Sequence, residues 1–131
     1  MRNFLKYCRL SFIISMLGCN AAKASTDTLE LISPQDASTL SAEKKAVIID
    51  VREDGEWNTV HIPGAIHIPL AQLNNRLSEL QPYKNSGIIT QCRSGARSAK
   101  ALDILMSAGF THVKNMEGGL IAWHKAGLKT Q

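Results

Sequence analysis

Short apolar segments alternate along this chain with stretches in which apolar residues recur every three to four positions. Five segments have the apolar, β-branched character of strands, and they lie at residues 28–32, 46–51, 65–68, 87–90 and 111–115. The segment AVIIDV at 46–51 is apolar almost throughout, which is typical of a strand covered on both faces. Alternation of such strands with helices predicts an α/β domain, with a five-stranded parallel sheet and helices on both faces.

Four of the intervening segments carry helix signals. The Ser-Pro pair at 33–34 supplies a cap and a first-turn proline for a helix that runs to about residue 40. Leucines at 70, 73, 77 and 80 share one helical face and are followed by Pro82. Residues 97–108 are rich in helix formers, and a glycine pair at 118–119 precedes a last amphipathic segment. These stretches are predicted to be helices that cover the sheet.

The stretch EDGEWNT at 53–59 shows no such pattern. It contains three acidic residues, Glu53, Asp54 and Glu56. Acidic turns of this kind are usually solvated, so this stretch is predicted to be an exposed loop.

The first 24 residues differ from the rest of the chain. Arg2, Lys6 and Arg9 precede the apolar run LSFIISMLGC, which is shorter than the roughly 20 residues that span a bilayer. An Ala-x-Ala sequence follows at 22–24. Residues 1–24 are therefore predicted to be a signal peptide, and residues 25–131 a single periplasmic domain that does not itself insert into the membrane.

Two alternatives to cleavage after residue 24 remain. The sequence Met-Leu-Gly-Cys at 16–19 resembles a lipobox, in which Cys19 would carry a lipid anchor. A cytosolic protein with an apolar leader is the other alternative.

The leader also accounts for the net charge of +4. It holds four of the 15 basic residues and no acidic one, which leaves 11 basic against 11 acidic residues in 25–131. A neutral domain argues against a nucleic-acid partner.

Removal of the leader would leave a single thiol. The chain has three cysteines, of which Cys8 and Cys19 lie in the leader and Cys92 in the domain. Exported proteins usually hold cysteines in disulfide pairs, so an unpaired one suggests a reactive thiol or a missing partner.

Cys92 stands where a strand is expected to give way to a helix. Ligands bind at this edge of parallel sheets, and a helix N-terminus there favours an anion. Arg93 and Arg97 add positive charge. Three small residues separate the arginines and allow successive N–H groups to converge: Ser94, Gly95 and Ala96. These features favour a nucleophilic thiolate over a buried, inert cysteine.

Four motifs, in this order, resemble the rhodanese family of sulfurtransferases. They are IIDVRE at 48–53, HIPGAIHIP at 61–69, CRSGARS at 92–98 (hereafter the Cys92 loop) and NMEGGLIAW at 115–123. The resemblance covers roughly residues 28–125 and implies a rhodanese-like fold. One departure is visible, because the family usually has glycine before the histidine of the second motif, where this chain has Val60. The geometry of the turn at 59–61 is therefore open.

The resemblance implies a reaction. Cys92 would attack the outer sulfur of a small anionic donor such as thiosulfate, become a persulfide, and pass the sulfur to cyanide or a thiol. Arg93 directly after the cysteine suits an inorganic donor better than mercaptopyruvate. No metal or organic cofactor is expected. The groups expected to hold donor and persulfide are Arg93, Ser94, Gly95, Ala96, Arg97 and Ser98.

Asp50 and Arg52 match family positions that support the site, but a structural ion pair is an equal interpretation from sequence. His61 and His67 are six residues apart, fit no tight metal motif, and are interpreted as ordinary side chains.

Two other functions are weighed against sulfur transfer. Phosphatases and arsenate reductases of this fold also use a cysteine in an arginine-ended loop, but theirs has one residue more than the four between Cys92 and Arg97. A sulfur carrier or binding module for a partner protein would use the same persulfide chemistry.

Overall fold

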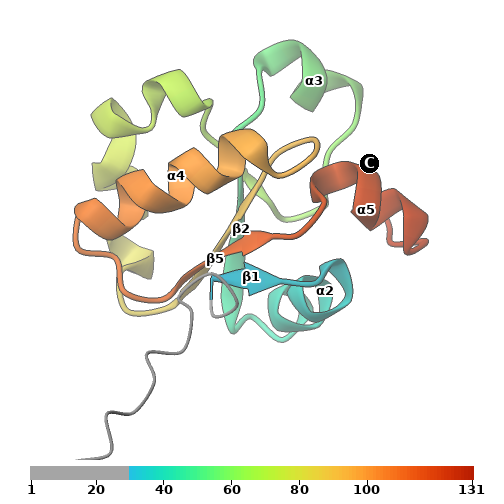
Figure 1. Ribbon diagram of the computed structural model, residues 1–131, viewed down its shortest axis with the longest axis horizontal. Coiled ribbons are helices and arrows are strands. Elements are labelled where there is room, and N and C mark those ends of the chain that lie inside the picture. Colours follow the sequence, from blue (N-terminus) through green and yellow to red (C-terminus); the bar gives the residue numbers. More distant parts are fainter. Residues whose placement is uncertain (1–29) are drawn as a thin grey trace, which may run out of the picture.

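Five parallel strands form one sheet in the computed structural model, which describes residues 30–131. The order across the sheet is β1-β5-β4-β2-β3, which confirms the predicted parallel α/β architecture (Figure 1). The predicted signal peptide and the start of the predicted first strand lie outside the described residues. The strands are β1 (Leu31–Ile32), β2 (Ala46–Asp50), β3 (Ile66–His67), β4 (Gly87–Gln91) and β5 (Val113–Met116).

Successive residues of the central strands point to opposite faces of the sheet, as the pleat requires. Ile48 of β2 is in register with Ile89 of β4, and both belong to one apolar cluster. Their neighbours Ile49 and Ile88 belong to a second cluster. A strand buried on both faces explains why AVIID reads as a nearly unbroken apolar run.

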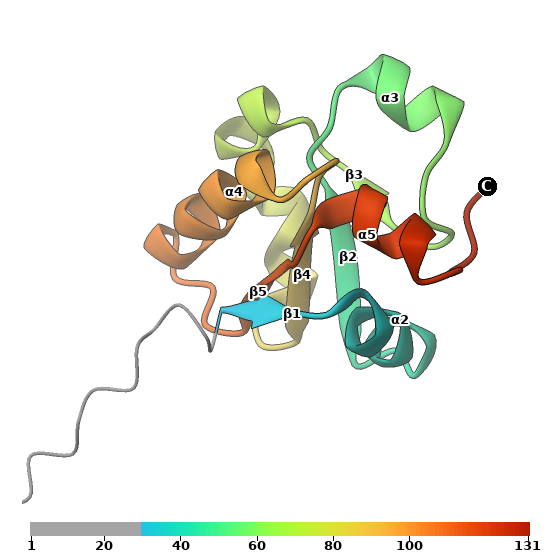
Figure 2. The ribbon, with the colours of Figure 1, turned by 45° about the vertical axis from the view of Figure 1, so that its right-hand side comes forward.

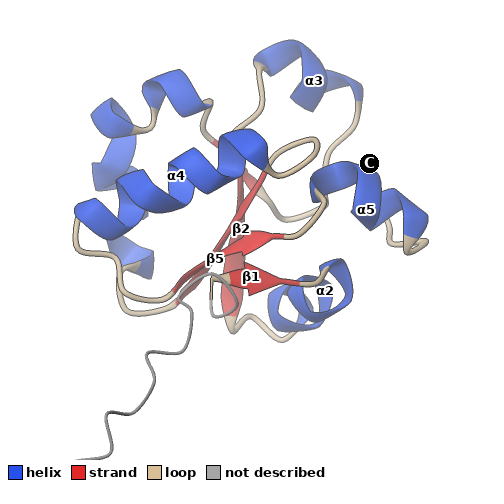
Figure 3. Ribbon diagram, viewed as in Figure 1, coloured by secondary structure: helices blue, strands red, loops and turns tan. Residues whose placement is uncertain are grey.

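Helices cover both faces, as predicted. The cluster around Ile48 is closed by α2 (Pro34–Ala42) and α5 (Gly119–Lys125), and that around Ile49 by α4 (Ala96–Ser107) and the segments at 70–83. Figures 2 and 3 show α2 and α5 on one side of the sheet and α4 on the other. Within the described part of the chain, no helix is both long and apolar enough to cross a bilayer.

The leucine-rich stretch is helical but not the regular helix that its spacing predicts. It forms two 3₁₀ segments, η1 (Leu70–Gln72) and η2 (Asn74–Tyr83). Arg76 leaves helical geometry at φ −119°, and Pro82 has no N–H to donate. Leu73 and Leu80 are nevertheless fully buried, so the predicted apolar face is correct.

The acidic stretch at 53–59 is largely exposed, as predicted, but it is not a loop, and that part of the prediction is wrong. Residues Asp54–Thr59 form helix α3, which begins with reciprocal hydrogen bonds between Glu53 and Glu56. Such a capping box satisfies two N–H groups that the first helical turn leaves without partners. The helix stands over the carboxyl end of the sheet, close to the Cys92 loop (Figure 1).

Candidate active site

Cys92 directly follows β4, and its side chain lies inside the turn that leads to α4. The residue is only 1% exposed. Its Sγ accepts hydrogen bonds from the backbone N–H of Gly95 at 3.1 Å and from Ser98 Oγ at 3.2 Å. The loop therefore presents hydrogen-bond donors to the sulfur from two residues that follow it in the chain.

These donors control the charge of the sulfur. Burial raises the pKa of Cys92, but hydrogen bonds from the Ser98 hydroxyl and from the backbone N–H groups of Ser98, Gly95 and Ser94 lower it by more. The net result is a pKa below the ordinary value for cysteine. The thiolate is the nucleophilic form, so this environment activates Cys92.

Gly95 directs its N–H toward the sulfur because its carbonyl is held elsewhere. That carbonyl accepts from the N–H of Ala99 and from Asn115 Nδ2, each at 3.1 Å. The φ of Gly95 is +112°, a backbone conformation that residues other than glycine rarely adopt. Asn115 thus fixes the loop from the neighbouring strand β5.

Asn115 is the first residue of the motif at 115–123, but the motif alone does not show its role. Asn115 is 7% exposed. Asn115 is two positions after buried Val113 and so shares its face of β5, and a polar residue on that face is the signal that would have found it.

Helix α5 holds the start of the loop. The N–H of Leu120 donates to the carbonyl of Cys92 at 2.8 Å, and that of Ile121 donates to the carbonyl of Arg93 at 3.1 Å. The approach requires glycine at 119, where a Cβ atom would lie 2.5 Å from the Arg93 carbonyl oxygen. The Gly-Gly pair therefore serves contact with the loop as well as the turn.

Arg97 is engaged by α3. Its Nη1 and Nη2 donate to Oε1 and Oε2 of Glu56 at 2.6 and 3.0 Å. The hydrogen bond with Arg97 lowers the pKa of Glu56 to about 2, and the Glu56 hydrogen bond in turn raises the pKa of Arg97. Each terminal nitrogen of Arg97 thus donates one hydrogen bond to Glu56, and the contact of Arg97 with a sulfur donor stays a prediction.

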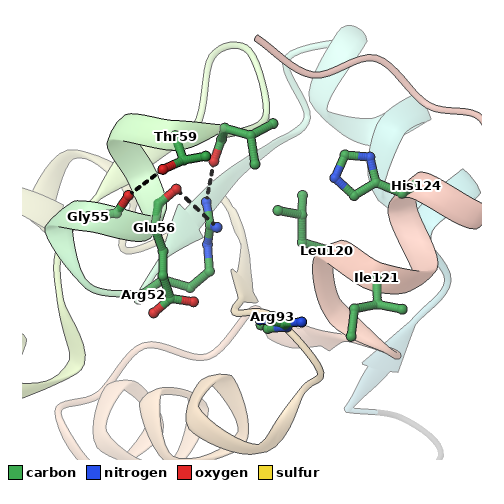
Figure 4. Close-up of a pocket in the computed structure, with 9 residues that line it drawn as sticks. Arg52, Gly55, Glu56, Thr59, Arg93, Leu120, Ile121 and His124 are labelled. Atoms are coloured by element: carbon green, nitrogen blue, oxygen red, sulfur yellow. Dashed lines mark hydrogen bonds between the residues drawn. The ribbon is translucent and has the colours of Figure 1, made fainter.

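A cavity of about 420 Å³ lies between α3 and α5, with Arg93 of the Cys92 loop at its edge (Figure 4). Arg93 is exposed, and none of the ion pairs within residues 30–131 includes it. The cavity is lined by Arg52, Gly55, Glu56, Thr59, Val60, Arg93, Leu120, Ile121 and His124. Nothing in the sequence connects His124 or α3 with the site, because only the fold brings them to it.

Asp50 and Arg52 form a buried ion pair, with Arg52 Nη2 at 2.7 Å from Asp50 Oδ2. Arg52 Nη2 also donates to the carbonyl of Val60 at 2.7 Å, so the pair ties the end of β2 to the residue after α3. Of the two interpretations, the geometry is that of a structural ion pair that also borders the cavity.

Val60 fits its position without strain. Its backbone is extended, at φ −160° and ψ 140°, a conformation open to any residue. The absence of the usual glycine therefore leaves the turn at 59–61 intact.

The two histidines of the second motif pack against one tryptophan. The rings of His61 and His67 stack on Trp57, with centroids 3.8 and 4.9 Å away. His61 Nδ1 lies 2.9 Å from the carbonyl of Trp57, and His67 Nε2 lies 2.7 Å from that of Arg52. Between residues 30 and 131, no three His, Cys, Asp or Glu side chains gather in a way that would hold a metal ion.

Comparison with known proteins agrees with this geometry. Residues 33–126 match the model of the rhodanese-like domain. The chain belongs to the rhodanese family. A rhodanese-related protein from Thermoplasma volcanium has a similar solved structure, with a TM-score of 0.70 and 26% identity over 78% of this chain and 97% of that one.

Curated relatives in this family include longer proteins. The chain is 37% identical to an uncharacterized protein from Synechocystis over 82% of its own length, but spans 59% of that relative. It is 34% identical to a sulfurtransferase from Allochromatium vinosum, over 76% of this chain and 91% of that protein. It is 39% identical to the thiosulfate sulfurtransferase PspE from Escherichia coli, over 53% of this chain and 67% of that protein. Two of these three relatives are thus named for sulfur transfer.

Proposed function

We propose that this protein is a thiosulfate sulfurtransferase that carries sulfur on Cys92. The observation that supports it most directly is the pair of hydrogen bonds that Gly95 N–H and Ser98 Oγ donate to Cys92 Sγ. Hydrogen-bond donors around the sulfur stabilise the attacking thiolate and also the anionic persulfide that results. The similarity to PspE, named for the same activity, supports thiosulfate as the donor.

The first half-reaction loads the cysteine. The Cys92 thiolate attacks the outer sulfur of thiosulfate, a new S–S bond forms, and sulfite leaves with the electron pair of the bond that breaks. Exposed Arg93 binds the anionic donor, while loop N–H groups from Ser94 to Ser98 face the reacting sulfur. In the second half-reaction a cyanide or thiolate acceptor takes the outer sulfur, and the Cys92 thiolate is restored.

Mass spectrometry of the intact protein tests loading. After incubation with thiosulfate and removal of excess reagent, the protein should gain the mass of one sulfur atom, and Cys92→Ala should gain none. Circular dichroism of the variant serves as the folding control. A wild-type protein that gains no sulfur would contradict the proposal.

A persulfide carrier for a partner protein is the second candidate. It is favoured by 37% identity over 64% of this chain to a putative sulfur carrier protein, YrkF, from Bacillus subtilis. Steady-state turnover separates the two. An enzyme should release many equivalents of thiocyanate from thiosulfate and cyanide, whereas a carrier should load once and discharge slowly to small acceptors.

Phosphate chemistry is a weaker candidate. A solved structure from Rhodopseudomonas palustris, described as a possible tyrosine phosphatase, has a TM-score of 0.71 and 27% identity to this chain. The four residues between Cys92 and Arg97 make a shorter loop than phosphatases of this fold use. Hydrolysis of an aryl phosphate should therefore be negligible beside sulfur transfer, and a comparable rate would contradict this.

We also propose export to the periplasm with cleavage after residue 24. N-terminal sequencing of the protein from its native host should find Ser25 first. If the protein is recovered with membranes and Cys19→Ala abolishes this association, the lipid-anchored alternative is supported instead.

A further inference from the structure

Two buried side-chain amides donate hydrogen bonds to carbonyls of the Cys92 loop. Gln91, the last residue of β4, is fully buried, and its Nε2 donates to the carbonyl of Cys92 at 3.0 Å. Asn115 of β5 donates in the same way to the carbonyl of Gly95. Each amide therefore uses its nitrogen on a carbonyl of this loop.

The oxygens of the same two amides have no hydrogen-bond partner in the protein. Among residues 30–131, the buried side-chain nitrogens and oxygens without a partner are Gln91 Oε1 and Asn115 Oδ1. A buried acceptor of this kind destabilises a fold, because it loses its hydration and gains no hydrogen bond in return. Both of these unfavourable positions border the Cys92 loop.

Packing alone does not explain the amide at position 91. Gln91 is two positions after Ile89, so its side chain lies on the face of β4 that carries the apolar cluster with Met116 and Leu120. A methionine has nearly the same length and flexibility and would leave no polar oxygen without a partner. An apolar residue would therefore suit this part of the core better than glutamine does.

The hydrogen bond from Gln91 fixes the carbonyl of the reacting residue. The Cys92 carbonyl accepts from the N–H of Leu120 at 2.8 Å as well as from Gln91 Nε2, so both of its lone pairs are used. With Leu120 alone, the carbonyl could tilt about a single hydrogen bond. A carbonyl oxygen that turned toward Sγ would repel a thiolate there. The carbonyl also belongs to the planar peptide unit that continues to Arg93, so the same contact orients the start of the loop.

From these observations we infer that Gln91 is a positioning residue for the chemistry of Cys92. It acts through the Cys92 carbonyl, which its amide keeps turned away from the sulfur. The inference rests on the proposed persulfide chemistry, and it adds to that chemistry a residue that lies outside the four sequence motifs.

Gln91→Met tests the inference in the full-length protein. The change removes the donor and the unpartnered oxygen together and keeps the length of the side chain. The first readout is the rate of iodoacetamide alkylation against pH, which depends on the thiolate and on no sulfur donor. It is measured on the tryptic peptide that contains Cys92, so that Cys8 and Cys19 do not contribute. The profile should move to higher pH, and alkylation and persulfide loading at pH 7 should each be about fivefold slower.

Stability is the second readout, and it should not fall with reactivity. The urea midpoint of Gln91→Met should equal or exceed that of the wild type, because one hydrogen bond and one unpartnered acceptor are lost together. A residue that served only the core would give a lower midpoint and an unchanged alkylation profile. Gln91→Leu repeats both measurements with a shorter apolar side chain.

The matched control is Thr90→Val on the same strand. Thr90 is also fully buried, and its Oγ1 donates at 3.4 Å to the carbonyl of Lys114, which belongs to β5 and not to the loop. Valine removes this buried hydrogen bond with little change of shape. The alkylation profile of Thr90→Val should therefore match that of the wild type.

Three results would overturn the inference: an unshifted profile in folded Gln91→Met, an equal shift in Thr90→Val, or a lower urea midpoint in both variants of Gln91. Failure of the proposed function gives a different result. If thiosulfate loads no sulfur onto the wild type, the proposed function is wrong, while the alkylation profiles still decide whether Gln91 controls the reactivity of Cys92.

Discussion

Glu56 of α3 and Arg97 of α4 form a two-point ion pair across 41 positions of sequence. The pair joins helix α3, which lies over the carboxyl end of the sheet, to the last arginine of the Cys92 loop. Since each partner is about one-third exposed, the contact is neither fully solvated nor fully buried. It holds α3, which forms one side of the cavity, against the loop.

Acid should weaken this contact. The pKa of Glu56 is lowered from its ordinary 4.5 to about 2, chiefly by the hydrogen bond with Arg97. A carboxylate with a depressed folded-state pKa stabilises the fold fully above the unfolded value, and this stability is lost as pH falls through the folded value. Urea unfolding of Glu56→Gln should show a loss of about 1 kcal/mol at pH 7, with solvent screening taken into account.

The difference between wild type and Glu56→Gln should shrink as pH falls from about 4.5 toward 2. The matched control is Glu79→Gln, whose partner Arg76 lies three residues away on the same 3₁₀ segment, η2. A difference that does not change over this pH range would show that the pair contributes no stability through its charge.

Ser98 should set the reactivity of the cysteine. Removal of the hydroxyl in Ser98→Ala takes away the 3.2 Å hydrogen bond to Sγ and leaves burial, which raises the pKa of Cys92, less opposed. The rate of iodoacetamide alkylation against pH should therefore shift to higher pH, with a several-fold slower reaction at pH 7. An unshifted profile in a folded variant would assign activation to the backbone N–H groups alone.

Asn115 should act through Gly95 rather than on the substrate. Asn115→Asp replaces the donor to the Gly95 carbonyl by an oxygen that repels it. Persulfide loading should slow about tenfold, and the unfolding free energy should fall by about 1–3 kcal/mol. The exposed neighbour Lys114 offers a control, because Lys114→Ala on the same strand should change neither. A shift of the alkylation profile to higher pH would identify positioning, which a loss of stability alone would not produce.

Gly119 should be the least replaceable residue of α5. In Gly119→Ala the new methyl group would meet the Arg93 carbonyl at 2.5 Å, and unfolding should become easier by about 3 kcal/mol or more. Gly127→Ala separates backbone strain from this clash, since Gly127 also has positive φ but nothing within 4 Å of the new atom. Gly127→Ala should lower the free energy of unfolding by about 1 kcal/mol, as measured by thermal or urea unfolding. Equal costs would show that the loop tolerates the methyl group.

The sequence predicted what depends on local pattern. The strands are apolar and β-branched, and the Cys92 loop carries its small residues and arginines within seven positions, so both are visible in the one-dimensional order. The fully buried Leu73 and Leu80 follow from spacing alone, although the 3₁₀ geometry of their segment depends on Pro82 and Arg76.

Contacts between distant segments could not be predicted in this way. Helix α3 has six residues and no buried side chain, so it leaves no apolar periodicity to detect. Glu56 meets Arg97, and Asn115 meets Gly95, only because the parallel sheet brings their segments to one edge. Glu56 lies in a polar stretch and is therefore predicted to be solvated, because the sequence does not show that Arg97 is its partner.

The carbonyls of the Cys92 loop have one further consequence. Those of Cys92, Arg93 and Gly95 are each bound by groups outside the loop, from α5, α4 and β5. These three carbonyls therefore point away from the sulfur, and the N–H groups of Ser94, Gly95 and Ser98 face it before any donor arrives. These N–H groups are oriented when the protein folds, so an incoming anion need not reorganise them. The folded Cys92 loop is thus preorganised to bind an anionic sulfur donor.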